Sequence, residues 1–225
     1  MIKKIFLLVS VTSMLLAVPT WGADKTKDEE TIRNATTVLQ AMVGSKDIPL
    51  STVEKADCII ILPSVKKFAV GIGGTGGRGP MTCREGANFT GKWSPPAMYS
   101  IGGASAGFQI GGTAKDFVIL VMAPSAANKV LDGKVKVGSD ATAAAGSGAS
   151  ASTSTADILT YSRTSGLFAG VSLDGASLDP DTDANQRLYG KNVSAREIVG
   201  GTAVKPTPAG QQLVSVLDSK AGKKM

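Results

Sequence analysis

The stretch Cys58-Ile59-Ile60-Ile61-Leu62-Pro63 is the starting point for interpreting the fold. Its four consecutive large apolar residues include three β-branched ones, a pattern typical of a short strand that is buried on both faces. Pro63 has no backbone N–H to donate and is expected to end the strand. The sequence therefore predicts a central strand over 58–62, and the elements on either side of it define the fold class.

The chain before this strand has the pattern of a helix. Thr26 and Glu29 have the spacing of a capping box, and Gly44 stands where a helix would stop. We therefore expect an amphipathic helix over 27–43, followed by a shorter helix that begins near 47–49 and ends at 56. The apolar residues that recur at helical spacing in the first helix are Ile32, Ala35, Leu39, Met42 and Val43.

The chain after this strand has the pattern of further strands. Strands over 68–73 and 81–84 are expected around a turn at 74–77, where three of the four residues are glycine. These strands follow one another too closely for crossover helices, so the sheet should be mainly antiparallel. The fold class is therefore α+β: a mainly antiparallel β-sheet or barrel-like core with an N-terminal amphipathic helix and short peripheral helices. Further strands are expected over 98–103, 107–112, 117–122, 141–146, 158–163 and 167–173, a loop or irregular edge within 143–155, and short helices over 125–131, 183–188, 195–199 and 209–218.

The first 23 residues have the layout of a secretory signal peptide. Lys3 and Lys4 precede an apolar run over 5–18, and small residues follow. That run is shorter than the roughly 20 residues that span a bilayer, and no cysteine stands at the cut to carry a lipid. We expect cleavage near Gly22 or Ala23, export to the periplasm or the medium, and one domain over 24–225 with its core over about 27–218.

Composition excludes several classes of function. The chain of 225 residues has no histidine, so it contains no Ser-His-Asp triad and no histidine-ligated metal. Its net charge of +6 falls to +4 when the two lysines of the signal leave. With 5% aromatic residues and no long basic run, nucleic acid is not an expected partner. The two cysteines, Cys58 and Cys83, could form a disulfide after export or remain buried thiols.

Three motifs resemble chemical sites but each lacks a required part. The G-x-G-x-x-G match over 71–76 is followed by no amphipathic helix, so a glycine hairpin is the better interpretation. In the G-x-S-x-G match over 103–107, Ser105 has no histidine base, and only a Ser-Lys arrangement with Lys115 stays open. Asp179 opens a run that alternates oxygen ligands like a calcium loop, but Gly190 stands where that loop needs Glu. We expect an acidic turn there, with Asp183 capping the next helix, and neither a metal nor a cofactor.

Several stretches together resemble the SYLF domain family. They are the helix and strand over 48–62, Gly91-Lys92-Trp93-Ser94-Pro95-Pro96-Ala97, the segments 107–111 and 116–120, and Tyr161-Ser162-Arg163-Thr164-Ser165-Gly166-Leu167-Phe168-Ala169-Gly170-Val171-Ser172-Leu173-Asp174-Gly175. The family includes eukaryotic lipid-binding and actin-binding proteins and exported bacterial members. The likeness covers about 27–218 in the family's order and spacing.

The resemblance implies a non-enzymatic module that binds acidic phospholipid, with the N-terminal helix as a main contact. In an exported chain, anionic phospholipid of the cell envelope is the expected partner and actin is not; the alternative is an envelope protein that acts through protein contacts. The helix itself carries more acidic than basic residues near its start, so its apolar stripe either inserts into lipid or packs on the sheet. The expected lipid contacts are the cations Lys66, Lys67, Arg78, Arg84, Lys92 and Arg163 and the apolar residues Ile32, Leu39 and Met42.

Overall fold

The computed structural model describes residues 21–70, 72–106, 111–133, 135–137, 143–144, 157–163 and 176–222. The elements are α1 (Trp21–Gly44), α2 (Leu50–Lys55), β1 (Cys58–Val70), β2 (Ile72–Cys83), β3 (Ala97–Ala106), β4 (Gly111–Val121), α3 (Pro124–Leu131), β5 (Val135–Val137), β6 (Ala143–Ala144), β7 (Ile158–Arg163), β8 (Ala176–Pro180), α4 (Thr182–Tyr189), α5 (Ala195–Val199) and α6 (Pro208–Lys220).

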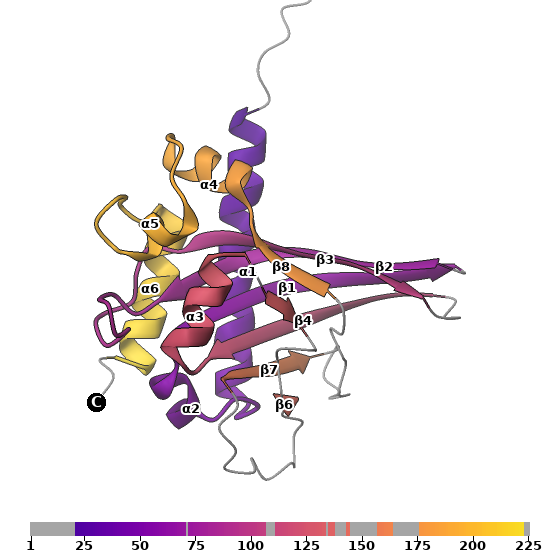
Figure 1. Ribbon diagram of the computed structural model, residues 1–225, viewed down its shortest axis with the longest axis horizontal. Coiled ribbons are helices and arrows are strands. Elements are labelled where there is room, and N and C mark those ends of the chain that lie inside the picture. The colour runs from indigo at the N-terminus through magenta and orange to yellow at the C-terminus, as the bar shows by residue number, and fades with distance from the viewer. Residues whose placement is uncertain are drawn as a thin grey trace, which may run out of the picture.

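These strands form one sheet between two layers of helices (Figure 1). The strand order is β5-β8-β3-β2-β1-β4-β7-β6, and every pairing except β6 with β7 is antiparallel. One face of the sheet is covered by α3 and α5. The other face is covered by α1, α2, α4 and α6. The predicted α+β class, with a mainly antiparallel sheet and an N-terminal helix, is therefore confirmed.

The central strand is longer than the sequence predicted. β1 does not end at Pro63 but continues to Val70, because the chain forms a β-bulge instead of stopping. Leu62 lies opposite Phe117 and Val65 opposite Lys115, so β1 has one residue more than β4 over this interval. Ser64 takes up the extra length at φ 52°, a left-handed backbone conformation that few non-glycine residues adopt.

The predicted glycine turn lies inside a strand. Residues 74–77 belong to β2, where 74–76 pair with both β1 and β3 and Gly77 pairs with β3. The hairpin reverses instead between Val70 and Ile72. A Cβ on Gly79, further along β2, would lie 1.8 Å from the carbonyl oxygen of Ile61, so this strand uses a glycine for close approach of two backbones.

The helices match the predictions in place, with one difference at the start of α1. Thr26 is not an N-cap, because α1 already begins at Trp21 and the Thr26 hydroxyl donates to the carbonyl of Gly22 within the helix. The helices predicted over 125–131, 183–188, 195–199 and 209–218 correspond to α3 to α6. The predicted signal peptide up to residue 20, the strand over 167–173 and most of the loop over 143–155 lie outside the described residues.

Arg84 connects three separate segments at one end of the sheet. It follows directly on Cys83, which forms a disulfide with Cys58 across the β1–β2 pair. The guanidinium donates to carbonyls of Ala56 at the end of α2 and of Ala221 at the end of α6, and its centre lies 4.3 Å from the centroid of the Trp93 ring. Carbonyls at helix C-termini attract a cation, so Arg84 fixes two helix ends to the sheet.

Arg84→Met should lower the free energy of unfolding by about 2–4 kcal/mol, because it leaves several buried carbonyls without a donor. Urea unfolding, followed by far-UV circular dichroism, measures this change. Arg33→Met, at an exposed position on α1, is the control and should change the free energy by less than about 0.5 kcal/mol. Equal stability of Arg84→Met and the wild-type chain would contradict this role.

Candidate functional site

Helix α1 lies flat on the sheet with its apolar stripe buried. Ile32, Leu39 and Met42 are at most 1% exposed and pack on a cluster that includes Ile59 and Ile61 of β1. Of the two alternatives for these three side chains, the structure therefore shows packing on the sheet. None of the described helices is long and apolar enough to cross a membrane.

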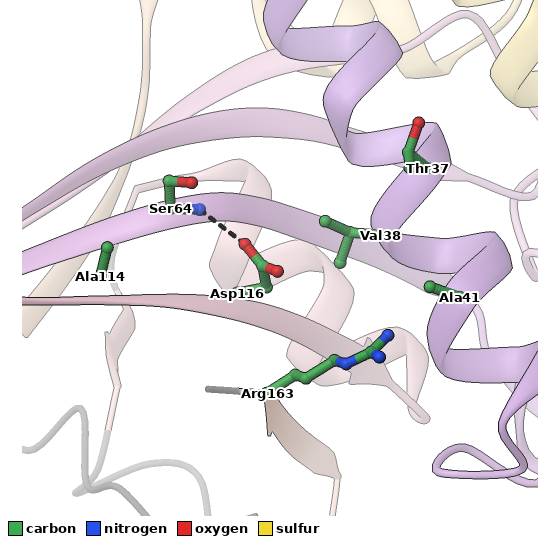
Figure 2. A pocket seen from close by; sticks show the side chains of 7 residues that line it. All are labelled: Thr37, Val38, Ala41, Ser64, Ala114, Asp116 and Arg163. Atoms are coloured by element: carbon green, nitrogen blue, oxygen red, sulfur yellow. Dashed lines mark hydrogen bonds between the residues drawn. The ribbon is translucent and has the colours of Figure 1, made fainter. Parts of the chain in front are cut away.

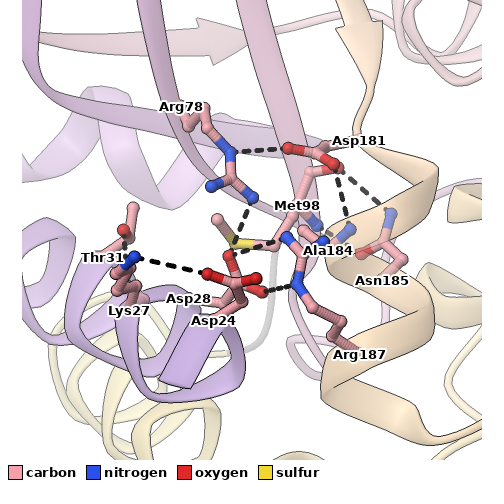
Figure 3. A network of polar contacts seen from close by, with 10 residues as sticks. All are labelled: Asp24, Lys27, Asp28, Thr31, Arg78, Met98, Asp181, Ala184, Asn185 and Arg187. Atoms are coloured by element: carbon pink, nitrogen blue, oxygen red, sulfur yellow. Dashed lines mark hydrogen bonds and ion pairs between the residues drawn. The ribbon is translucent and has the colours of Figure 1, made fainter. Parts of the chain in front are cut away.

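Asp28 fixes the N-terminal half of α1 to the sheet and to α4 (Figure 3). Its carboxylate is fully buried and accepts from two guanidiniums, Arg78 of β2 at 2.8 Å and Arg187 of α4 at 2.8 and 3.2 Å. Hydrogen bonds to Asp28 raise the pKa of Arg187. A buried carboxylate is stable only when it is paired in this way, so these residues define where α1 can lie. We call Asp28, Arg78, Arg187 and Asp181 the clasp.

Asp181 completes the clasp and corrects one prediction. Its carboxylate accepts from Arg78 Nε at 2.6 Å and from the backbone N–H of Ala184 at 3.0 Å. The N-cap of α4 is therefore Asp181 and not Asp183, because only the former lies one residue before the helix. Among the described residues no group of three acidic or cysteine side chains could hold a metal ion.

Two open hollows lie along one flank of α1, above the same face of the sheet. The first has a volume of about 370 Å³, and the cations Lys66 and Arg78 are part of its wall. Gly76 also lines this hollow, and a Cβ added to Gly76 would have no other atom within 4 Å. The residues that line it are Thr31, Asn34, Pro63, Ser64, Lys66, Gly76, Gly77 and Arg78.

The second hollow adjoins the first at Ser64 and has a volume of about 440 Å³ (Figure 2). Asp116 and Arg163 lie opposite each other on β4 and β7. The Arg163 side chain extends past Asp116 toward α1, while the Asp116 carboxylate accepts from the backbone N–H of Ser64 at 2.9 Å. The remaining lining residues are Thr37, Val38, Ala41 and Ala114.

The two hollows form one groove, which we call the α1 groove. Three of the six predicted cations, Lys66, Arg78 and Arg163, line it. In the part of the chain that the structure describes, the side chains of Lys66 and Arg163 form no hydrogen bond or ion pair. Arg78 uses two of its nitrogens in the clasp and is 38% exposed. The groove thus presents cationic side chains to solvent beside a docked helix.

Comparison with known proteins shows the family of this chain. The family model described as Ysc84, Las17-binding protein actin regulator, matches residues 102–220, about half of the chain. The chain belongs to the Ysc84 family. The resemblance to the SYLF domain is thereby confirmed.

Relatives of the Ysc84 family match most of this chain. The "SH3 domain-containing YSC84-like protein 1" of Xenopus laevis is 31% identical over 205 residues, which are 88% of this chain and 60% of the relative. The "LAS seventeen-binding protein 3" of Saccharomyces cerevisiae is 31% identical over 191 residues, which are 81% of this chain and 40% of the relative. The chain thus spans about half the length of these relatives. No solved structure matches it.

The other three predicted cations do not line the α1 groove of this Ysc84 family member. Arg84 is only 1% exposed and binds backbone carbonyls, so the prediction that it contacts lipid headgroups from the surface is wrong. Burial lowers its pKa, and the nearby charge of Asp218 raises it. Lys92 is exposed and lies 3.7 Å from Glu85. Lys67, next to Lys66 on β1, points to the opposite face of the sheet.

The aromatic rings of Trp93 and Tyr99 belong to the core. Trp93 is 2% exposed and donates its indole N–H to the carbonyl of Ala221. Tyr99 is fully buried, and this burial raises the pKa of its hydroxyl. Neither ring is available to a membrane.

Sequence reasoning missed the acidic residues that organise the groove. Asp28 is one of the acidic residues near the start of the helix, yet it lies on the same buried face as Ile32, Ala35 and Leu39. An acidic residue four positions before an apolar stripe is the one signal that could have identified a buried ion pair. Nothing local to Asp116 indicated its contact with Ser64, because 52 residues separate them.

Asp28→Asn should lower the free energy of unfolding by about 3–5 kcal/mol, because both Arg78 and Arg187 lose a buried anion. Urea unfolding measures the change, with Asp24→Asn as the control. Asp24 lies on the same helix, forms an ion pair with exposed Lys27 and reaches Arg187 only through its charge among the described residues, so its replacement should cost less than about 1 kcal/mol. Equal effects of the two substitutions would show that the clasp does not hold α1.

Proposed function

We propose that this chain is a non-enzymatic binding module that attaches to anionic phospholipid surfaces through the α1 groove. The observation that carries the proposal is that Lys66 and Arg163 share one face of the sheet and form no ion pair with the described residues. An unpaired cation at a surface is available to an anionic headgroup. Arg78 lines the same groove, but its charge is paired with Asp28 and Asp181 in the clasp.

The spacing of the two unpaired cations suits a surface of headgroups. Lys66 lies opposite Ala114 on β4, and Arg163 lies opposite Asp116, two residues further along the same strand. Strand spacings of about 4.8 Å and a rise of about 3.3 Å per residue place the two Cα atoms about 12 Å apart. Two long side chains can converge from that distance on one phosphate or reach two neighbouring ones.

Helix α1 remains docked in this proposal. Its insertion would break the buried ion pairs of Asp28, at a cost of about 3–5 kcal/mol, and would uncover the apolar sheet face around Ile59 and Ile61. Each basic residue near an anionic surface contributes only about 1 kcal/mol. Surface attraction is therefore too weak to open the clasp, and the groove binds with the helix in place.

The chain's chemistry gives no support to an enzyme. The Ysc84 family model describes a binding protein and regulator. Ser105 pairs with Gly73 within the β2–β3 ladder, one pair from its end, rather than standing on a sharp turn between a strand and a helix. A hydrolase that uses Ser105 is therefore not proposed.

Lys66→Gln combined with Arg163→Gln should weaken binding to vesicles of phosphatidylglycerol and phosphatidylcholine by about 30-fold, because two basic residues leave the contact. Vesicle flotation at low salt measures the binding. The matched control is Lys205→Gln with Lys220→Gln, which removes the same charge from exposed positions outside the groove. An equal loss in both variants would show that net charge matters and the groove does not, and no binding by the wild-type chain would overturn the proposal.

The second candidate function is contact with a protein partner, and the names of the relatives favour it. The yeast relative is named a LAS seventeen-binding protein, and the family model names an actin regulator. A partner held by packed side chains stays bound at high salt, whereas attraction to lipid is screened. Binding to actin filaments that persists at high salt, with no binding to anionic vesicles, would favour this candidate.

Export of the chain belongs to the same proposal. The signal-like layout of the first 23 residues supports it, and the disulfide between Cys58 and Cys83 is of the kind that oxidising compartments maintain. In the envelope, phosphatidylglycerol-like lipids would be the anionic surface. The expectation that actin is not a partner depends on export and stays a prediction.

A further inference from the structure

The bulge at Ser64 decides which face of the sheet receives Lys66. Before the bulge, Ile60 and Leu62 point into the core under α3 and α5, and Ile61 points toward α1. In an unbroken strand, where side chains alternate, Lys66 would point to the same side as Ile60 and Leu62, away from α1. The extra residue reverses this alternation.

The pairing of β1 with β2 and with β4 shows the same reversal. Between Ile60 and Lys66, β1 advances six residues while β2 advances only five, from Met81 to Gly76. On its other side β1 pairs with β4, and there the register shifts between Leu62 and Val65. As a result Val65 fills the core, and Lys66 lines the α1 groove with Asn34 of the helix.

Asp116 stabilises this bulge. Ser64 stands at φ 52°, and its backbone N–H donates to Asp116 Oδ1 at 2.9 Å (Figure 2). A left-handed conformation is unfavourable for a serine unless its surroundings hold it. The carboxylate supplies a charge-assisted hydrogen bond at that point, from the strand next to the bulge.

A carboxylate is otherwise an unsuitable residue for a groove that binds anions. Asp116 lies directly opposite Arg163, yet no ion pair joins the two described side chains. Its contact with Ser64 gives the carboxylate a role that its charge alone does not explain.

We propose that Asp116 is a positioning residue for anion binding: by holding the Ser64 bulge, it turns Lys66 into the α1 groove. The inference rests on the proposed function and names the residue that organises its site. This proposal predicts the opposite effect on anion binding from the one that the charge of Asp116 alone would predict. Removal of an acid from an anion site should strengthen binding, whereas loss of the bulge should weaken it.

Three substitutions of Asp116 separate these effects in flotation with phosphatidylglycerol vesicles. Asp116→Ala should bind about fivefold more weakly, which is the affinity that one basic residue contributes at an anionic surface. Asp116→Asn keeps an acceptor for the Ser64 N–H and removes the charge, so it should bind as tightly as the wild-type chain or up to about fivefold more tightly. Asp116→Glu keeps the charge but moves the carboxylate by one methylene, and it should weaken binding severalfold even if Asp116→Ala does not fold.

The link to Lys66 is tested by combining substitutions. Lys66→Gln should weaken binding about fivefold in the wild-type chain and less than about twofold in Asp116→Ala, because Lys66 has already left the groove there. Tighter binding by Asp116→Ala, or a full fivefold effect of Lys66→Gln in its background, would overturn the proposal.

Amide hydrogen exchange separates this proposal from the proposed function. The N–H of Ser64 should exchange at least tenfold faster in Asp116→Ala and Asp116→Glu than in the wild-type chain and Asp116→Asn. If the wild-type chain does not bind vesicles, the proposed function is wrong, and exchange at Ser64 still decides whether Asp116 holds the bulge. Unchanged exchange in Asp116→Ala and Asp116→Glu would overturn the positioning role.

Discussion

The rest of the site depends on the ion pairs that the buried carboxylate of Asp28 forms with Arg78 and Arg187. The carboxylate joins α1 to β2 and α4 through two guanidiniums, and a charge at 0% exposure persists only while those partners stay in place. The clasp therefore fixes the position of the helix over the sheet. That position buries the apolar stripe of α1 and leaves its other flank beside Lys66 and Arg163, so the same contact that closes the core also forms the groove.

The local pattern of the sequence was sufficient to predict most elements. β7 and α5 have the predicted bounds. α5 is bounded by local signals, because the capping box of Ser194 and Glu197 starts it and Gly200 follows its last residue. Proline and glycine misled the interpretation where tertiary contacts outweigh local preference. Pro63 lies within a bulge that Asp116 supports from another strand, and the glycines of 74–77 lie inside a ladder between two neighbouring strands.

The cations of the site could be predicted only as members of a larger set of candidates. Lys66, Arg78 and Arg163 come from three different strands, and a bulge decides the direction of one of them. Arg84 could not be distinguished from a surface cation, because the carbonyls that bury it belong to segments as far away as Ala221. The ion pairs were missed for the same reason: Asp28 has the period of the apolar stripe, but nothing local to it indicates Arg78 or Arg187 as its partners.

The central claim is that the chain binds an anionic surface with α1 docked, and hydrogen exchange on vesicle-bound protein tests it most directly. Amides over 28–44 and over α6 should stay as protected on phosphatidylglycerol vesicles as in solution. A rise of tenfold or more in exchange over α6, which packs against α1, would show that the helix leaves the sheet on binding and would contradict the account.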